Sequence, residues 1–276
     1  MAMIVGVDGG NNEVKVACPT RVFKFLSNLG EYRERRLDQV FSEDDMIVEY
    51  NGKKRFAGTL AKYESEFVGS MMGSSKAHED FLYRVLIALH KCEDLNFKVI
   101  VGQPIISHIE MEKRKMKDML IGEHLFTVND IDRNIVIEQA EVAAEGGAAF
   151  WSNPVAGLVH ILDIGSGTVN AATLDEGRYI DKMSFTLKFG MSTNYSVDMF
   201  EMARAIASSA SKKWSKNAKV LLVGGGAESL LAPLTDYFSD TTILKPKFMV
   251  GTLALNLRPV YANAVGFYNI GRKVYG

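Results

Sequence analysis

Cysteine is scarce in this chain of 276 residues, which contains two, Cys18 and Cys92. Two cysteines are too few for a disulfide framework or a cysteine metal site, so we expect free thiols in a reducing cytosol. The net charge is small as well: the chain has 32 Lys and Arg and 33 Asp and Glu, which gives a formal net charge of −1. A near-neutral chain has no broad basic field to attract nucleic acid, so we expect no direct DNA binding outside a local patch.

Long hydrophobic runs are absent too. No uninterrupted apolar stretch approaches the roughly 20 residues that cross a bilayer, and Asp8 and two glycines interrupt the N-terminal apolar run. We therefore expect no signal peptide, no membrane contact and a cytoplasmic protein. The hydrophobic fraction of 47% and the charged fraction of 24% are typical of globular proteins, and the length allows one or two domains with a sizeable core.

The chain does contain three glycine-rich turns, the first of them near its start. Ile4 to Val7 has the pattern of a strand that ends at Asp8, and Val14 to Val16 that of the returning strand. The turn between them consists of Gly9, Gly10, Asn11 and Asn12, and such small residues let backbone N–H groups approach an anion. Asp8 is a candidate for holding a hydrated Mg²⁺, and Lys15 for neutralising a phosphate. The same pattern also fits an ordinary glycine hairpin with a capping Asp.

Two further glycine-rich turns also follow apolar strands. After His160 an apolar strand ends at Asp163, and the turn that follows contains Gly165, Ser166, Gly167 and Thr168. The third turn joins a buried-type strand, Val220 to Val223, to a helix start through Gly224, Gly225, Gly226 and Ala227. A helix N-terminus of this kind favours negative charge. The third turn lacks both the G-x-G-x-x-G of a dinucleotide fold and the G-K-[ST] of a P-loop.

Three such turns in this order resemble those of the actin-like ATPase superfamily. Asp8 to Lys15 looks like its first phosphate loop, Asp163 to Thr168 like its second, and Val223 to Ala227 like its adenosine loop. Residues 136–150 and 261–271 resemble its two connecting helices. About 50 residues separate the second and third turns, where larger relatives carry a whole extra subdomain. This compression narrows the resemblance to the bacterial plasmid-segregation actins of the ParM-like group, and within it to the small AlfA-type members.

The resemblance implies an α/β fold of two ribonuclease H-like lobes around a nucleotide cleft. We expect the first lobe to contain residues 1–152 and 259–276, with the first phosphate loop and the connecting helices. We expect the second lobe to contain residues 153–258, with the second phosphate loop and the adenosine loop but without the extra subdomain. Small residues near Gly147 and at Gly266 would permit hinging between the lobes.

The resemblance also assigns roles to residues. Backbone groups of the two phosphate loops would hold the phosphates of ATP or GTP, Asp8 and Asp163 would hold Mg²⁺ through its waters, and Gly224 to Ala227 would pack against the nucleoside. Glu138, Glu141 and Glu145 are three and four residues apart, which places them on one face of a predicted helix. Glu141 aligns with the glutamate that orients the attacking water in plasmid-segregation actins. Without the resemblance, the same spacing fits three solvated glutamates on an exposed helix.

The function that the resemblance implies is a filament-forming ATPase that positions plasmid copies through a separate adaptor bound to centromere DNA. Two alternatives stay open. One is a small-molecule kinase of the same fold, like the pantothenate or sugar kinases, which would need a base carboxylate beside a hydroxyl acceptor. The other is a nucleotide-dependent scaffold that does not hydrolyse. The sequence does not decide between ATP and GTP.

Local patterns predict further elements. Apolar alternation indicates strands at 21–25, 97–101, 131–137 and 179–188, and Asn51-Gly52 indicates a hairpin between 46–50 and 53–56. Helical spacing indicates an amphipathic helix over 79–92, and helices over 109–120 and 197–210. Residues 69–75, rich in glycine and serine, have the composition of a mobile loop.

Overall fold

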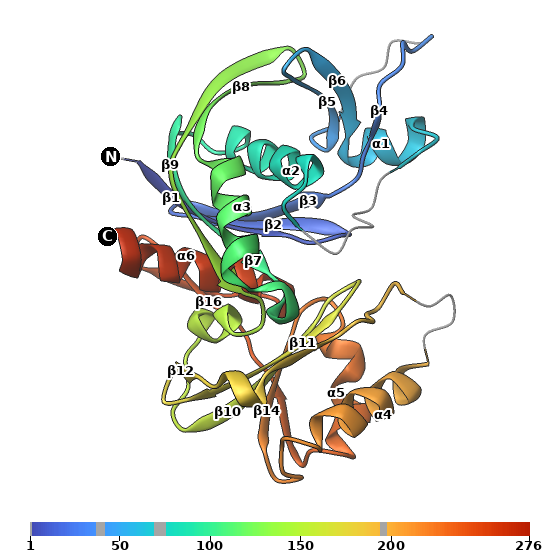
Figure 1. The fold of residues 1–276 in the computed structure, drawn as a ribbon, viewed down its shortest axis with the longest axis vertical. Helices are drawn as coiled ribbons and strands as arrows, with labels where there is room; N and C mark the ends of the chain where they lie inside the picture. The colour runs from blue at the N-terminus through green and yellow to red at the C-terminus, as the bar shows by residue number, and fades with distance from the viewer. Residues whose placement is uncertain (1, 37–41, 69–75, 194–197) are drawn as a thin grey trace.

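A computed structural model of the chain describes residues 2–36, 42–68, 76–193 and 198–276. Two twisted sheets lie one above the other along the long axis of the molecule, and helix α6 (Ala262–Tyr275) lies between them (Figure 1). The two-lobed α/β arrangement that the sequence predicts is therefore present. The predicted loop at 69–75 lies outside the described residues.

Among the described residues the first sheet has nine strands, of which three adjacent ones are parallel. In spatial order they are β3 (Arg21–Leu26), β2 (Glu13–Cys18), β1 (Met3–Gly9), β7 (Asn96–Gln103), β9 (Ile131–Ala144), β8 (Gly122–Val128), β5 (Asp45–Tyr50), β6 (Lys53–Ala57) and β4 (Leu29–Glu31). Strand β7 runs parallel to both β1 and β9. The carboxyl ends of parallel strands meet at one edge of a sheet, so the residues that follow β1 and β9 are brought together.

The second sheet is smaller and also contains adjacent parallel strands whose carboxyl ends share one edge. Its spatial order is β12 (Arg178–Tyr179), β11 (Val169–Asp175), β10 (Leu158–Ile164), β14 (Lys219–Val223) and β15 (Asp240–Ile243), and β13 (Phe185–Leu187) also pairs with β11. Strands β10, β14 and β15 are parallel. The turns after β10 and β14, which are the second and third glycine turns, therefore share one edge.

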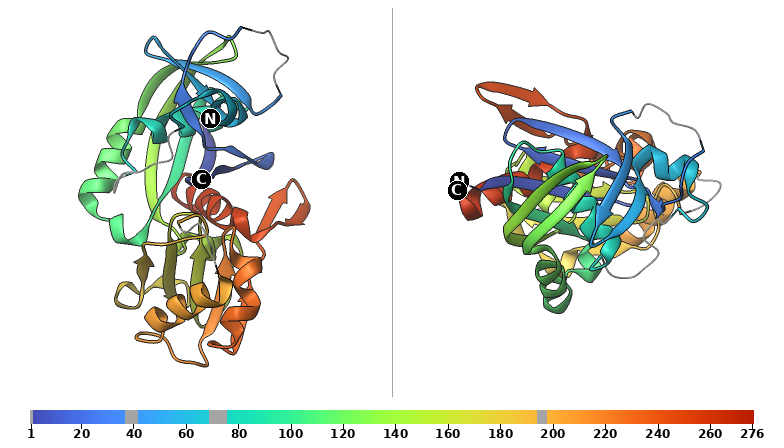
Figure 2. Two further views of the ribbon diagram at one scale, coloured as in Figure 1. Left: turned by 90° about the vertical axis from the view of Figure 1, so that its right-hand side faces the viewer. Right: turned by 90° about the horizontal axis from the view of Figure 1, so that it is seen from above.

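Helices cover both sheets. The α-helices are α1 (Gly58–Glu64), α2 (Glu79–His90), α3 (Glu110–Leu120), α4 (Met199–Ala210), α5 (Ala227–Thr235) and α6, and short 3-10 helices span Ile105–Ser107, Ala148–Ser152, Asp181–Met183 and Pro259–Tyr261. A separate hairpin of β16 (Lys247–Val250) and β17 (Leu253–Asn256) stands away from both sheets (Figure 2). Phe248 anchors it against Tyr268 of α6.

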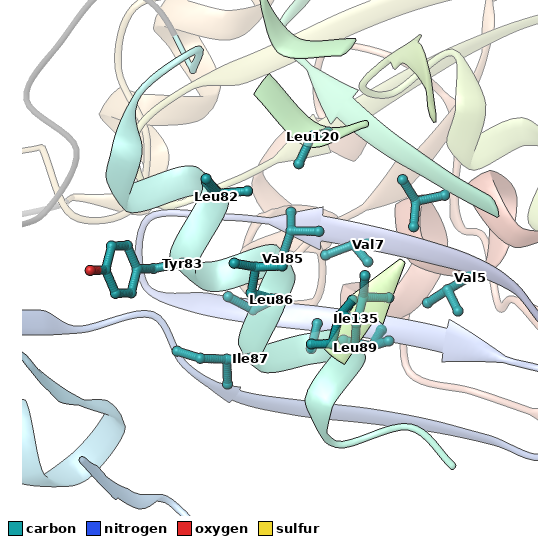
Figure 3. Packing of buried hydrophobic residues seen from close by; sticks show 14 of the residues in the cluster. Val5, Val7, Leu82, Tyr83, Val85, Leu86, Ile87, Leu89, Leu120 and Ile135 are labelled. Carbon is teal, nitrogen blue, oxygen red and sulfur yellow. The ribbon is translucent and has the colours of Figure 1, made fainter. Parts of the chain in front are cut away.

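Helix α2 forms the centre of the first core. Residues 81–90 are all buried, because the sheet curls around the helix so that β1, β2, β8 and β9 all contact it. Leu82, Val85, Leu86 and Leu89 pack among Val5 and Val7 of β1 and residues of α3 and β9 (Figure 3). The predicted helix is confirmed, but its amphipathic character is not, since the curled sheet covers the face that was expected to be solvated.

The predicted first connecting helix is wrong. Residues 136–144 belong to the long strand β9, and only Ala148–Ser152 form a short 3-10 helix. The buried residues of β9 are Ile135, Ile137, Ala140 and Val142, and a register shift opposite Phe97 and Lys98 separates the two pairs. This bulge converts strict alternation into a spacing that resembles a helix. Pairing with β7 then outweighs the helix propensity of the Ala and Glu residues.

The other local predictions fared better. The hairpin at 46–56 is confirmed, with positive φ at Asn51 and Gly52, and so is the second connecting helix as α6. The expected strand over 179–188 is broken into β12, a 3-10 helix and β13. Within the described residues, no helix combines the length and the apolarity that crossing a membrane requires. The lobe boundaries at 152/153 and 258/259 stay predictions.

His160 gives the second lobe a dependence on pH. The side chain is 2% exposed, stacks on Trp214 with ring centroids 4.3 Å apart, and its Nδ1 lies 2.9 Å from Oγ1 of Thr173. Burial lowers its pKa from 6.5 to about 4. The folded state keeps the ring neutral while the unfolded chain takes up a proton below pH 6.5, so this contribution to stability is lost as the pH falls from 6.5 toward 4.

We expect the free energy of unfolding to fall by about 2 kcal/mol more in the wild type than in His160→Gln between pH 7.5 and pH 5. Glutamine does not titrate in this pH range, whereas other acid-sensitive groups affect both proteins equally. Urea unfolding of the two proteins at both pH values measures the difference. Parallel pH profiles would show that His160 does not carry this dependence.

Candidate nucleotide site

A cavity of about 450 Å³ lies between the two sheets. This volume is within the range of pockets that bind small molecules and cofactors. Its walls come from both lobes and from the start of α6, and the lining residues are Asp8, Gly10, Asn11, Lys15, Lys76, Pro104, Ile106, Ser107, Glu145, Asp163, Gly165, Ser166, Gly167, Thr168, Asn170, Thr186, Lys188, Gly224, Gly225, Pro259, Val260 and Asn263. The two sheet edges described above thus face a shared space.

Two glycine turns meet at this cavity. The turn after β1 and the turn after β10 come so close that a Cβ on Gly167 would lie 2.8 Å from Nδ2 of Asn11. Across the described residues, no acceptor pairs with the backbone N–H groups of residues 10–12 or of residues 166–168. Six N–H groups with no acceptor on two adjoining turns are the donors that a phosphate chain requires.

Three carboxylates converge beside these turns. Asp8 and Asp163 lie next to the last residues of β1 and β10, and Glu145 directly follows β9. Each of the three residues is at most 8% exposed. Burial, followed by the charges of Glu145 and Asp8, raises the pKa of Asp163 to about 7, although the Asn263 amide bound to its Oδ2 acts in the opposite direction. Burial and the two neighbouring carboxylates therefore disfavour a negative charge on Asp163.

Glu145 is held on both of its carboxylate oxygens. Lys76 forms a salt bridge with Oε1, and Nδ2 of Asn170 donates to Oε2 at 3.1 Å. The backbone N–H of Glu145 donates to the carbonyl of Gln103 at 2.9 Å. Donors from the first lobe and from β11 of the second lobe therefore fix this carboxylate in one orientation.

Asn170 also joins the two lobes directly. Its Oδ1 accepts hydrogen bonds from the backbone N–H of Ile105 at 3.2 Å and from the hydroxyl of Thr186 at 2.8 Å. Ile105 follows β7 of the first lobe, and Thr186 belongs to β13 of the second lobe. The side-chain amide of Asn170 thus bonds to both lobes and also holds Glu145 in position.

Glu141 lies outside the cavity. Its side chain is 45% exposed, forms a salt bridge of 2.6 Å with Lys117 of α3, and does not line the cavity. The helix prediction placed Glu138, Glu141 and Glu145 on one face, but in β9 the first two lie along the strand and Glu145 lies beyond its end. This position gives no support to Glu141 as a group that orients water, whereas Glu145 has the burial and the surroundings for such a role.

The third glycine turn forms a wall of the cavity. The N–H groups of Gly224, Gly226 and Ala227 donate to the carbonyls of Pro259, Ile164 and Gly224. These groups are therefore not free to bind an anion. Gly224 and Gly225 line the cavity while Gly226 and Ala227 do not, so the turn offers a surface for packing.

The conformation of Gly224 admits no side chain. Its φ is +86°, and a Cβ would lie 2.5 Å from the Ile164 carbonyl and 2.8 Å from Oδ1 of Asp163. We expect Gly224→Ala to lower the free energy of unfolding by about 3 kcal/mol. Gly225→Ala is the matched control, because a Cβ there meets nothing within 4 Å. Equal unfolding curves for the two variants would contradict this expectation.

Most of the predicted site residues line the cavity. They are Asp8, Gly10, Asn11, Lys15, Gly165, Ser166, Gly167, Thr168, Asp163, Gly224 and Gly225. Five do not, namely Gly9, Asn12, Gly226, Ala227 and Glu141. The sequence predictions missed Lys76, Asn170, Lys188 and Asn263. Asn170 follows the second glycine turn by two residues and Asn263 lies in the predicted second connecting helix, so both could have been singled out, but no local signal marks Lys76.

The comparison with protein families decides the classification. Residues 6–147, just over half of the chain, match the model of the actin-like proteins N-terminal domain. The chain belongs to the actin-like protein family. The region matched in this actin-like protein contains the second half of β1, the glycine turn after it, α2, β7 and β9.

Solved structures of AlfA and ParM have the same fold as this actin-like protein. An AlfA filament bound to AMPPNP is 21% identical with a TM-score of 0.77 over 100% of both chains. AlfA from B. subtilis plasmid pLS32 is 22% identical with a TM-score of 0.77 over 96% of this chain and 97% of that one. A 15-stranded ParM filament from Clostridium botulinum is 18% identical with a TM-score of 0.78 over 99% of each chain. No curated protein matched the sequence. The predicted actin-like fold is confirmed.

Proposed function

We propose that this actin-like protein binds ATP or GTP with Mg²⁺ in the interlobe cavity, hydrolyses it and forms filaments that position plasmid DNA in the bacterial cytoplasm. One observation carries the proposal: two turns with unpaired N–H groups, one from each lobe, adjoin three buried carboxylates in one cavity. The filament part rests on the likeness to AlfA and ParM filaments.

The residues present fit a hydrated magnesium ion. Asp8 and Asp163 are buried acids at facing sheet edges; burial and, after it, the charges of Glu145 and Asp8 raise the pKa of Asp163, and a cation would offset those charges. No cluster of three or more His, Cys, Asp or Glu side chains suitable for a metal ion occurs among the described residues. Mg²⁺ retains several of its waters, so two carboxylates that contact those waters suffice. The ion would supply positive charge to the phosphates.

Binding would use groups from both lobes. In this mechanism the N–H groups of residues 10–12 and 166–168 donate to the phosphate oxygens. Lys15, whose Nζ donates to the Glu13 carbonyl at 3.1 Å, adds positive charge at the first turn. Gly224 and Gly225 pack against the nucleoside. Because one ligand contacts both turns, its binding favours the closed arrangement of the lobes.

Hydrolysis would depend on Glu145. Attack on the terminal phosphate requires a water held in line with the bond that breaks. The Glu145 carboxylate accepts a hydrogen bond from this water while Lys76 and Asn170 fix its orientation. The phosphate turns stabilise the charge on the departing group. Loss of the terminal phosphate removes contacts that bridge the turns, which weakens the closed state and the filament contacts that depend on it.

DNA contact would be indirect. With a net charge of −1 the chain has no strong field for nucleic acid. We propose that a separate adaptor binds the plasmid centromere and the filament, as the family resemblance implies. The purified protein alone is then expected to leave plasmid DNA unshifted in a mobility assay at physiological salt.

Sedimentation tests the proposal. The purified protein is centrifuged at high speed with Mg²⁺ and ATP, GTP, ADP or no nucleotide, and phosphate release is followed in the same tubes. We expect pelleting that depends on one nucleoside triphosphate and is accompanied by phosphate release. A protein that stays in solution under all conditions and transfers phosphate to a hydroxyl acceptor would be a kinase of this fold. Pelleting without phosphate release would indicate a non-hydrolysing scaffold.

A further inference from the structure

Arg84 of α2 carries a buried charge that its surroundings compensate poorly. The residue is 0% exposed, and neither Nη1 nor Nη2 has a hydrogen-bond partner among the described residues. Asp80 favours the charged guanidinium and Arg55 disfavours it, while Asp80 is itself paired with Arg55 at 2.6 Å. An uncompensated buried cation costs free energy, and apolar replacements of such groups are often neutral or stabilising. Stability alone therefore does not account for an arginine here.

Within the described part of the chain, Arg84 makes one hydrogen bond, and it leads to the first phosphate turn. Its Nε donates to the carbonyl of Ser27 at 3.0 Å. Ser27 is 1% exposed; its N–H donates to the carbonyl of Asn12 at 3.2 Å, and its hydroxyl donates to the carbonyl of Asn11. Two consecutive carbonyls of the turn are thus held by one serine, and that serine is held by Arg84.

Peptide geometry transmits this restraint to the cavity. In a trans peptide the C=O of Asn11 and the N–H of Asn12 lie in one plane and point in opposite directions. A bond that fixes the Asn11 carbonyl therefore fixes the direction of the Asn12 N–H, one of the six unpaired donors. Asn11 also lines the cavity and adjoins Gly167 of the opposite turn. Arg84 and Ser27 do not line the cavity, so any effect they have on a ligand passes through the turn.

We propose that Arg84 is a positioning residue that, through Ser27, holds the first phosphate turn in the conformation that binds nucleotide phosphates. The inference rests on the proposed nucleotide binding and extends it to residues behind the site. The buried charge is then retained for the shape of the turn and at a cost in stability, which distinguishes it from a structural residue.

The test compares Arg84→Met, Ser27→Ala, the double variant and wild type. Binding of a non-hydrolysable ATP or GTP analogue with Mg²⁺ is titrated calorimetrically, and thermal unfolding is measured without ligand. We expect Arg84→Met to weaken binding about tenfold, as loss of a hydrogen bond from a charged group does, and Ser27→Ala to weaken it about threefold. The affinity of the double variant should lie within about twofold of that of Arg84→Met, because both changes act on one turn. The unfolding temperature of Arg84→Met should equal or exceed that of wild type.

Arg55→Met is the control for loss of positive charge beside α2, since Arg55 pairs with Asp80 and, within the described residues, makes no hydrogen bond to Ser27. It should bind the analogue like wild type. If Arg55→Met weakens binding as much as Arg84→Met, or if Arg84→Met unfolds several degrees lower, the positioning role is overturned. If wild type binds and Arg84→Met binds equally well, it is overturned as well. If wild type binds neither analogue, the proposed function itself fails.

Discussion

Glu145→Gln is expected to lower the rate of nucleotide hydrolysis at least about 100-fold, the scale of a lost general base or water-orienting group. Glutamine keeps the size of the side chain but offers its water a weaker acceptor, and one of its two former acceptor atoms becomes a donor. Nucleotide affinity should hold or improve, because a negative charge leaves a cavity built around phosphates. Steady-state phosphate release and equilibrium binding, measured on the same preparation, separate these two effects.

Glu141→Gln is the matched control, since it makes the same chemical change in β9, the strand that leads to Glu145, but outside the cavity. It removes an exposed salt bridge with Lys117, which contributes little to stability. We expect wild-type turnover from this variant and, from Glu145→Gln, filaments that assemble and persist. Normal turnover in Glu145→Gln together with slow turnover in Glu141→Gln would return the catalytic role to Glu141.

Asp163→Asn is expected to weaken binding of the Mg²⁺–nucleotide about 100-fold or more while stabilising the free protein. The raised pKa means that the fold disfavours the ionised carboxylate. Because the unfolded chain loses this proton near pH 4 and the folded chain near pH 7, stability from this group declines as the pH rises through that interval. At pH 8 a neutral asparagine, which can still accept from Asn263, should therefore raise the unfolding temperature.

Asp163→Asn is expected to weaken nucleotide binding but to raise the stability of the free protein, and these opposite effects make the variant informative. Asp175→Asn, at the far end of β11 and exposed, changes the same functional group away from the cavity and should alter neither property. Chelation of Mg²⁺ should weaken binding to wild type and leave the residual binding to Asp163→Asn unchanged. Wild-type affinity in Asp163→Asn would contradict a role for Asp163 at the metal.

The sequence predicted the turns of the site well because their chemistry is local. A glycine-rich turn after an apolar strand that carries Asp8 or Asp163 needs no distant partner to be recognised, and both turns do line the cavity. The segment from 136 to 150 failed because its Ala and Glu residues and its bulged apolar spacing imitate a helix. Pairing of residues 136–144 with the distant strand β7 determines that this part becomes a strand.

Residues that reach the site only through tertiary contacts could not be predicted from local sequence patterns. Lys76 reaches Glu145 because α2 begins beneath the first phosphate turn, where a Cβ on Gly9 would meet the ring of Phe81. Asn263 reaches Asp163 because α6 crosses between the lobes. Neither contact has a periodicity or motif of its own in the sequence. The same holds for Arg84, whose helical position predicts core packing but not a link to Ser27.

Amide hydrogen exchange of the wild-type protein tests the central claim most directly. Exchange is measured without ligand and with Mg²⁺ and a non-hydrolysable nucleotide, and the six backbone N–H groups of residues 10–12 and 166–168 are followed. The account predicts fast exchange of all six in the free protein and protection of both turns together on binding. Binding that leaves these amides unprotected, or that protects one turn and not the other, would contradict a nucleotide held between the lobes.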